Sequence, residues 1–252
     1  MAVELAGGCR VTSIREGKPQ VTGKLKSWPQ VGRNTGAQAI SLRTLECASG
    51  LSPGLCNRAG DEVLYVLSGQ GTLWIDGQAY EIAPETGCYI QPQQTFAIEN
   101  PHAEPLVIIS SQCPEPEEVA EFVAPPTTPV NEPPAIAPLI RLTDRKAIPT
   151  ADRWYRVLVN EEVRSRQVTQ FVGAIPPGRA PDHFHHYEEV LCILTGTGRM
   201  WAGATSTPIA AGSCIFLPKR QMHCVENTGA GELRLLGVFY PAGSPAVRYS
   251  AD

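Results

Sequence analysis

Three of the chain's five histidines lie within four positions of one another, in the segment HFHHYEE that begins at His183. Alternate side chains of an extended strand point to the same face, so His183 and His185 are predicted to face one way and His186 the other. Imidazole nitrogens and carboxylate oxygens are common ligands of divalent transition metals. The pattern predicts a metal site built from the first two histidines, from Glu189 and, later in the chain, from His223.

A site of three neutral imidazoles and one carboxylate leaves a divalent ion with a net charge of about +1 and, in an octahedral field, about two open coordination positions. We therefore expect one divalent transition metal per chain (Fe, Mn, Ni or Zn) and a small-molecule substrate as the partner. Glu189 is the candidate catalytic residue, because a carboxylate that leaves the metal can accept a proton. The alternative interpretation, polar histidines packed in a core, does not explain three of them at this spacing.

Several residues flank the predicted site in sequence and are candidates for lining a substrate pocket: Arg199, Met200, Phe216, Lys219, Arg220 and Met222. Arg220 has the most testable role among them, since a guanidinium group would bind an anionic substrate. The alternative for Arg220 is a solvated charge on a loop.

An internal repeat is the clearest guide to the organisation of the chain. DEVLYVLSGQGTLW begins at Asp61, and the similar EEVLCILTGTGRMW begins at Glu188, 127 positions later. Further on, GCYIQPQQTFAIEN corresponds to GSCIFLPKRQMHCVEN. The repeat predicts two copies of one domain, at residues 1–112 and 140–252, joined by a proline-rich linker at residues 113–139.

Short apolar runs separated by turn sequences indicate strands in both copies. With 23 glycines and 23 prolines in 252 residues, turns must be frequent, which favours an all-β fold of antiparallel barrels or sandwiches. The runs VLYVL and VLCIL are apolar on both sides. We expect one face of each run to line a barrel interior and the other to pack against another sheet or subunit.

The second copy resembles the cupin superfamily. Its residues match both motifs of that family in order: Gly178, His183, His185, Glu189 and Gly196, then Gly212, Pro218, His223 and Asn227. The departures are Gly178, which lies one residue closer to His183 than is usual, and Arg220, which stands where the second motif normally has glycine. The resemblance implies a bicupin, with two tandem cupin barrels of the double-stranded β-helix or jelly-roll kind, often dimeric.

The first copy is predicted to have lost the metal site. When the repeats are aligned on Glu62, Cys56 and Arg58 stand in the places of the first two histidines, and Phe96 stands in the place of the third. The permanent charge of an arginine would repel a cation. We therefore expect Arg58 to pair with Glu62 and the first barrel to carry no metal. A soft metal held by Cys56 and Glu62 is the alternative.

Composition excludes several classes of function. The net charge is -4 and the pI is about 5.8, and the chain has no lysine- or arginine-rich run, so nucleic acid is not an expected partner. No apolar stretch reaches the roughly 18 residues of a membrane helix, and the first residues show no secretory apolar region. The eight cysteines occur singly, without a CxxC pair. We expect a cytoplasmic protein with no membrane partner and with reduced thiols.

The leading functional hypothesis is a metal-dependent enzyme that acts on a small chelating metabolite. Cupins with three histidines and one glutamate often are dioxygenases, so the resemblance implies this reaction class. The second hypothesis is a Lewis-acid hydrolase, isomerase or cyclase. Its layout would be similar to that of ureidoglycine aminohydrolase, a bicupin with metal in the C-terminal half, although the ligand set of that family differs. The third is a noncatalytic cupin that binds a small ligand. A homodimer is compatible with all three.

Overall fold

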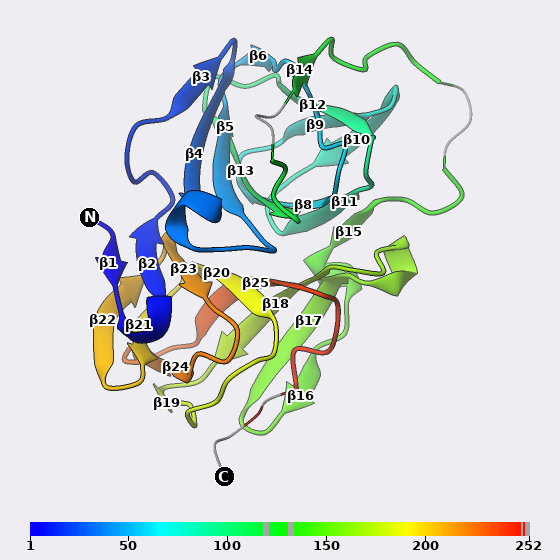
Figure 1. The fold of residues 1–252 in the computed structure, drawn as a ribbon. Coiled ribbons are helices and arrows are strands. Elements are labelled where there is room, and N and C mark those ends of the chain that lie inside the picture. Colours follow the sequence, from blue (N-terminus) through cyan, green and yellow to red (C-terminus); the bar gives the residue numbers. More distant parts are fainter. Residues whose placement is uncertain (118–120, 131–133, 248, 250–252) are drawn as a thin grey trace.

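The computed structural model describes residues 1–117, 121–130, 134–247 and 249. Within these residues the regular structure consists of strands and four short 3-10 turns, without an α-helix. The turns are η1 (Ala6–Gly8), η2 (Arg33–Thr35), η3 (Leu142–Asp144) and η4 (Glu161–Val163). The predicted all-β fold of two tandem barrels is confirmed (Figure 1).

The first barrel consists of a larger and a smaller antiparallel sheet. The order of the larger sheet is β15-β11-β8-β13-β5-β4-β3, and that of the smaller sheet is β10-β9-β12-β7-β14, with β6 beside β12. The strands of the larger sheet are β3 (Gln20–Thr22), β4 (Leu25–Val31), β5 (Leu42–Cys47), β8 (Asp61–Ser68), β11 (Thr86–Ile90), β13 (Leu106–Cys113) and β15 (Leu139–Arg141). Those of the smaller sheet are β6 (Gly50–Leu51), β7 (Gly54–Cys56), β9 (Gly71–Ile75), β10 (Gln78–Ile82), β12 (Thr95–Asn100) and β14 (Glu121–Val123).

The second barrel has the same two-sheet construction. Its larger sheet has the order β1-β2-β23-β20-β25-β18-β17-β16, and its smaller sheet has the order β19-β24-β21-β22. The strands of the larger sheet are β1 (Val3–Glu4), β2 (Arg10–Ser13), β16 (Ile148–Thr150), β17 (Arg153–Val159), β18 (Thr169–Ile175), β20 (Glu188–Thr195), β23 (Ser213–Leu217) and β25 (Leu233–Tyr240). Those of the smaller sheet are β19 (Gly178–Arg179), β21 (Thr197–Ala202), β22 (Thr205–Ala210) and β24 (His223–Asn227).

The two barrels match each other residue by residue in their central strands. Glu62 on β8 pairs with Ile90 on β11, and Glu189 on β20 pairs with Leu217 on β23. Both residues of the second pair lie 127 positions after those of the first, which is the spacing of the sequence repeat. The two copies therefore share strand register as well as strand order.

Strands also cross between the barrels. Near the N-terminus, β2 pairs with β23 of the second barrel, and after the linker β15 pairs with β11 of the first. In Figure 1 the blue strands β1 and β2 lie beside the orange β23. Within the linker, β14 pairs with β7. The ranges 1–112 and 140–252 describe the two copies of the sequence repeat. In space, each barrel also contains a strand that lies outside its own range.

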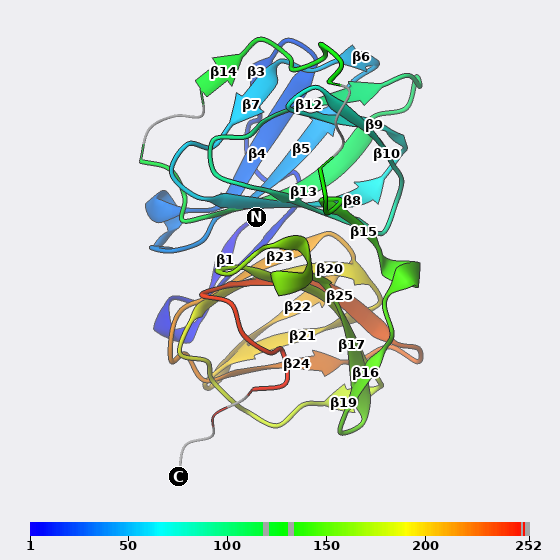
Figure 2. The ribbon, with the colours of Figure 1, turned by 90° about the vertical axis from the view of Figure 1, so that its right-hand side faces the viewer.

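The larger sheets of the two barrels pack face to face and share one hydrophobic core (Figures 1 and 2). Along β8, Val63 and Tyr65 belong to this shared core, whereas Leu64 and Val66 belong to the interior of the first barrel. The strand β20 repeats the pattern in the second barrel. The prediction that VLYVL and VLCIL use both faces is confirmed, and their second face packs against the other barrel of the same chain.

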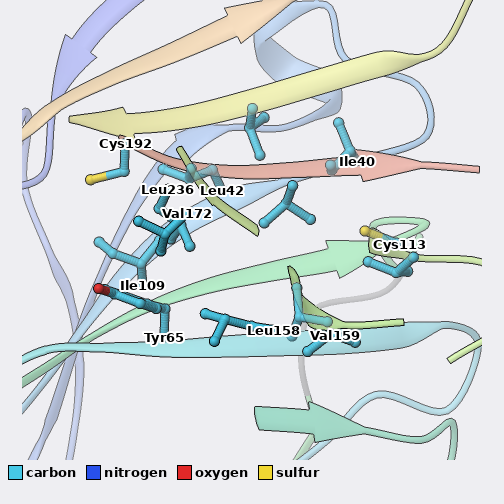
Figure 3. Close-up of a cluster of buried hydrophobic side chains, with 14 of the residues drawn as sticks. Ile40, Leu42, Tyr65, Ile109, Cys113, Leu158, Val159, Val172, Cys192 and Leu236 are labelled. Atoms are coloured by element: carbon cyan, nitrogen blue, oxygen red, sulfur yellow. The ribbon is translucent and has the colours of Figure 1, made fainter. Parts of the chain in front are cut away.

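Figure 3 shows part of this shared core. Tyr65 of β8 and Ile109 of β13 lie together with Val172 of β18 and Leu236 of β25. Full burial of one such side chain contributes roughly 1.5 to 3 kcal/mol. Because many side chains from both barrels take part, the shared core fixes how the barrels sit against each other.

The cysteines pack as the sequence predicts. All eight are free thiols, and seven of them are buried. Across the described parts of the chain, no helix is long and apolar enough to cross a membrane.

A buried carboxylate also joins the two barrels. Glu188, the first residue of β20, is 4% exposed. It accepts hydrogen bonds from the backbone N–H groups of Gln38 (3.0 Å) and Ala39 (2.7 Å), which lie between η2 and β5 of the first barrel. Hydrogen bonds to a charged group contribute about 1.5 to 3 kcal/mol. Glu188 is therefore a polar anchor beside the shared apolar core.

We predict that Glu188→Ala lowers the free energy of unfolding by about 2 to 3 kcal/mol, because it removes the acceptor from two N–H groups at the barrel interface. Urea denaturation followed by tryptophan fluorescence measures the change. The control is Glu81→Ala on the exposed side of β10, which should change the same quantity by less than about 0.5 kcal/mol. Equal effects of the two substitutions would show that Glu188 does not anchor the interface.

Candidate metal centre

Backbone pairing brings the predicted ligands together from distant parts of the sequence. His183, in the segment between β19 and β20, forms a two-residue antiparallel bridge with His223, the first residue of β24. The N–H of each donates to the carbonyl of the other, at 3.0 Å from His183 and 2.8 Å from His223. His185 follows two residues after His183, and Glu189 is the second residue of β20. The site therefore lies where both sheets of the second barrel meet.

The three predicted histidines form a compact triad. One ligand atom from each of His183, His185 and His223 lies within 4.8 Å of the others. The ring centroids of His183 and His185 are 5.0 Å apart. The ring centroid of His223 lies 4.6 Å from that of His183 and 5.3 Å from that of His185. Among the described residues, this triad is the one group of three or more such side chains that could hold a metal ion.

Hydrogen bonds set the tautomers of two members of the triad. The Nδ1 atom of His183 lies 2.9 Å from the carbonyl oxygen of Pro181, and that of His223 lies 2.8 Å from the carbonyl oxygen of Gln221. A carbonyl only accepts, so each Nδ1 carries the proton and each Nε2 carries the lone pair. Burial, together with the nearby His183, lowers the pKa of His223 to about 4, so this ring is neutral at pH 7. Neutral imidazoles oriented in this way fit a divalent transition metal.

Glu189 lies beside the triad in a buried position. Its Oε2 atom is 3.6 Å from Nε2 of His185. Burial raises the pKa of Glu189 to about 8, because the surroundings disfavour the charged carboxylate. A cation at the triad would favour that carboxylate. The position supports Glu189 as the fourth ligand, which remains a prediction.

The site opens into a small cavity inside the second barrel. Its volume is about 100 Å³, and all four predicted ligands line it. Tyr155 and Phe171 form apolar walls, and Arg153 lines the cavity at the start of β17. The sequence did not predict these three residues, because β17 and β18 carry no motif and become neighbours of the histidines only when the barrel closes.

The flanking residues proposed from sequence do not line this cavity. Met200 and Phe216 are buried in the hydrophobic cores, and Arg199, Lys219 and Met222 also lie outside the cavity wall. Arg220 is exposed, and its N–H donates to the carbonyl oxygen of His185 (2.7 Å). Its φ of 61° is left-handed, which explains why a glycine is usual at this point of the motif. Arg220 therefore supports the turn that holds His185, and its charge faces solvent.

His186 takes the outward position that strand alternation predicts. It is exposed, and its ring lies 4.2 Å from the ring of Tyr249, between centroids. His183 and His185, on either side of Phe184, face the cavity instead.

The first barrel has other residues in the three places of the histidine triad. Two of these residues differ from those that the alignment on Glu62, made without gaps, predicts. Leu55 on β7 pairs with Phe96 on β12, as His183 pairs with His223 in the second barrel. Phe96 therefore occupies the place of the third histidine, as predicted. Leu55, rather than Cys56, occupies the place of the first.

The second replaced position is Asn57 rather than Arg58. The carbonyl of Asn57 accepts the N–H of Gln93 (2.9 Å), in the same way as the carbonyl of His185 accepts that of Arg220. Gln93 and Arg220 are both left-handed, with φ of 72° and 61°. The first copy has one more residue between this point and the following strand, which is why an ungapped alignment shifts both positions by one.

Glu62 is retained in the first barrel but pairs with Arg43 instead of the predicted Arg58. Its Oε1 accepts from Nη2 of Arg43 (2.7 Å) and from the hydroxyl of Ser110 (2.6 Å). The side-chain amide of Gln112 donates to the other oxygen (3.3 Å). Arg43 reaches Glu62 because β13, which carries Ser110, is the only strand between β5 and β8.

We predict that the metal-free protein becomes less stable as the pH rises from 6.5 to 8. Burial raises the pKa of Glu189 from 4.5 to about 8, so the folded protein keeps a proton that the unfolded chain releases. His223 opposes this loss only slightly, because its folded-state ring, with a pKa of about 4, is neutral throughout the window, whereas the unfolded-state imidazole, with a pKa of 6.5, is half protonated at the lower end and mostly neutral above it. The expected loss is on the order of 1 to 2 kcal/mol.

Urea denaturation in the presence of a chelator measures this loss, and Glu189→Gln is the control that should remove it. An unchanged pH dependence in Glu189→Gln would show that the buried carboxyl is not the group that titrates.

We predict one metal ion per chain, bound through the triad. His185→Ala should weaken metal binding by more than the roughly 100-fold that loss of an outer hydrogen-bond partner can cause, because it removes a ligand. His186→Ala should leave the affinity unchanged, since this ring lies on the surface. Elemental analysis and competition with a chelating dye measure content and affinity. Equal losses in both variants would contradict the assignment of the inward face.

In a comparison with protein families, the chain matches the family described as "Cupin domain" over residues 50–111 and 171–239. Among solved structures, oxalate decarboxylase from Bacillus subtilis at pH 4.6 has a TM-score of 0.74 and 14% identity, over 92% of this chain and 76% of that one. A mutant of that enzyme has a TM-score of 0.75 and 13% identity, over 93% of this chain and 78% of that one. At these identities the likeness shows the fold alone.

No curated protein matches the chain. The two segments that match the cupin domain correspond to the two barrels and together cover more than half of the sequence. The chain therefore belongs to the cupin family, as a bicupin with two cupin domains in one polypeptide.

Proposed function

We propose that the chain is a metal-dependent enzyme that binds one divalent transition metal and acts on a small chelating metabolite, with dioxygenase chemistry as the reaction class. The observation that carries the proposal is the histidine triad, whose ligand atoms lie within 4.8 Å of one another in the wall of an internal cavity. A bound metal would supply open coordination positions to a chelating substrate and, as Fe(II), redox chemistry with oxygen.

The residues around the triad would hold the ion and manage a proton. His183, His185 and His223 would be neutral ligands, and Glu189 would lower the net charge of the site. Glu189 also lines the cavity beside the triad, so a carboxylate that leaves the metal there could accept a proton from a bound substrate. Glu189 is the residue to which we assign proton transfer to or from the substrate.

The cavity favours a small anionic substrate. Its volume is about 100 Å³, less than the roughly 150 Å³ of an engineered protein cavity that binds one benzene molecule. The Arg153 side chain is 11% exposed and lines this cavity; its Nε donates to Asp152 (2.9 Å), and its other N–H groups could bind a substrate carboxylate. Tyr155 and Phe171 give other parts of the cavity wall an aromatic surface. The fold neighbours are named for their action on oxalate, a substrate of this size and charge, which supports the same substrate class.

A Lewis-acid reaction without redox change is the second candidate. Hydrolysis, isomerisation and cyclisation need a polarising cation and a group that exchanges protons. The buried Glu189, 3.6 Å from His185, favours this candidate because it supplies the second requirement beside the triad. The two candidates differ in their dependence on the identity of the metal and on oxygen.

We predict that the Fe(II) form, reconstituted without oxygen, binds nitric oxide at an open coordination position. Its paramagnetic resonance signal should sharpen when a chelating carboxylate is added, because the substrate orders the site. The zinc form should show no turnover, since zinc has no redox chemistry. Paramagnetic resonance and oxygen uptake with a panel of small 2-oxo and 2-hydroxy acids measure these properties.

His186→Ala is the matched control, because it alters a histidine outside the cavity and should retain both signals. Full turnover of a substrate by the zinc form under argon would contradict the dioxygenase proposal. That outcome would support the Lewis-acid candidate and leave the metal site unchanged.

A further inference from the structure

The first barrel also contains a cavity, of about 260 Å³, bordered by β3, β4, β5 and the end of β13. The backbone register relates it to the metal cavity of the second barrel. Ser110 pairs with Arg43 in the first barrel, and Gly237, which lies 127 positions after Ser110, pairs with Phe171 in the second. Arg43 therefore stands where Phe171 forms a wall of the metal cavity.

A second position in the cavity wall also carries a polar residue in the first barrel and an aromatic residue in the second. Leu45 pairs with Ser27, whereas Gly173, its counterpart, pairs with Tyr155. Ser27 thus stands where Tyr155 lines the metal cavity, and it lines the cavity of the first barrel. Two aromatic walls have been replaced by a guanidinium group and a hydroxyl group. The first cavity is therefore larger and more polar than the second.

Arg43 is held so that it presents N–H donors to this cavity. Its Nη2 donates to Glu62 (2.7 Å) and its Nε donates to Ser110 (3.0 Å), whereas a guanidinium has five N–H groups. The Glu62 side chain is 1% exposed, and that of Arg43 is 12% exposed and lines the cavity. The carboxylate therefore lies behind the guanidinium, and the positive end of the pair faces the cavity. Such a dipole favours a ligand with a hydrogen-bond acceptor, and a carboxylate most of all.

Stability alone does not account for this pair. A buried ion pair costs desolvation, and well-packed apolar residues in its place are often neutral or stabilising. Phe171 shows that the fold accepts an apolar side chain at the position of Arg43. The retained charges thus point to a ligand. Two carboxylates, Glu115 and Glu117, also line the cavity. The Glu117 side chain is 83% exposed and pairs with the guanidinium of Arg33 (3.2 Å), whereas Glu115 accepts the backbone N–H of Arg33 (2.6 Å). Solvent and Arg33 therefore screen the charge of Glu117, while the charge of Glu115 opposes an anion that Arg43 attracts.

We propose that the cavity of the first barrel is a second ligand site, which binds a small organic acid with its carboxylate on Arg43. Leu25, Leu45 and Leu55 line the same cavity and would contact the hydrocarbon part of the ligand. The site needs no metal, and it is independent of the reaction in the second barrel.

The test uses the full chain after dialysis against a chelator, so that carboxylates cannot bind through a metal in the second barrel. Isothermal titration calorimetry with acetate, propionate, pyruvate and succinate should show saturable binding of at least one acid at one site per chain. The matching amide, such as propionamide for propionate, should bind at least tenfold more weakly, because it lacks the charge that strengthens hydrogen bonds to a guanidinium. Absence of binding by all four acids would overturn the proposal.

Two variants locate the binding. Ser27→Phe fills the cavity and leaves the pair of Arg43 and Glu62 in place, so it should abolish binding. Val21→Phe on β3 adds the same ring at a residue that is 62% exposed and outside the cavity, and it should bind like the unchanged chain. Retained binding in Ser27→Phe would show that the acid binds elsewhere and would overturn the proposal.

A third variant tests the guanidinium itself. Arg43→Met combined with Glu62→Gln removes both charges together, so that no buried charge is left without a partner. Binding of the acid should fall at least tenfold, while binding of the amide should change little. Equal weakening of acid and amide would indicate a distorted cavity rather than a lost carboxylate contact, and would contradict the role of Arg43. Circular dichroism of each variant checks that the strands are retained.

Discussion

Alternation of side chains along the central strands is the constraint on which both the barrel interface and the metal centre depend. On β20, Glu188 and Val190 face the other barrel, whereas Glu189 and Leu191 face the interior of their own. A shift of one residue would exchange the two sets and place Glu189 in the interface. The packing of two larger sheets against each other therefore also fixes the direction of the predicted metal ligand. The barrel interface and the predicted metal site therefore use opposite faces of β20.

The same backbone frame supports two different interiors. Both barrels have the same register in their central strands, and both retain a buried glutamate at the matched position. In the second barrel this residue, Glu189, lies beside three histidines and aromatic walls. In the first, Glu62 is bound to Arg43 and to two polar side chains of β13. Since the strands between the barrels are held by the shared core, the inward-facing residues can change without a change in the fold.

Sequence reasoning succeeded where a residue's place follows from local periodicity. The two-faced character of VLYVL depends on strand alternation alone. The inward direction of His185 and the outward direction of His186 follow the same alternation, although these two residues lie between the bridge at His183 and the start of β20 rather than in a strand. The repeat gave the register of the second barrel from that of the first. It also identified Phe96 as the replacement of a histidine, because no insertion lies between Phe96 and the end of its strand.

It failed where the place of a residue depends on closure of the barrel or on the length of a turn. Arg153 and Arg43 lie on strands without a motif, and they reach a cavity only through the pairing of distant strands. Cys56 and Arg58 were assigned one position too late, since one additional residue precedes β8 in the first copy. A turn absorbs such a residue without a change in the strands on either side, so hydrophobic patterning does not reveal it.

One hydrogen-bonded contact between the barrels lies close in sequence to the charged residues of both cavities. Glu188 adjoins Glu189 in the chain, and it accepts the N–H of Ala39 at 2.7 Å. Four residues after Ala39 comes Arg43, on β5. Transmission of a signal between two sites requires an element with two arrangements, whereas Glu188 is buried and accepts two backbone donors. The contact therefore keeps the loop before β5 against the start of β20, close in sequence to both Arg43 and Glu189.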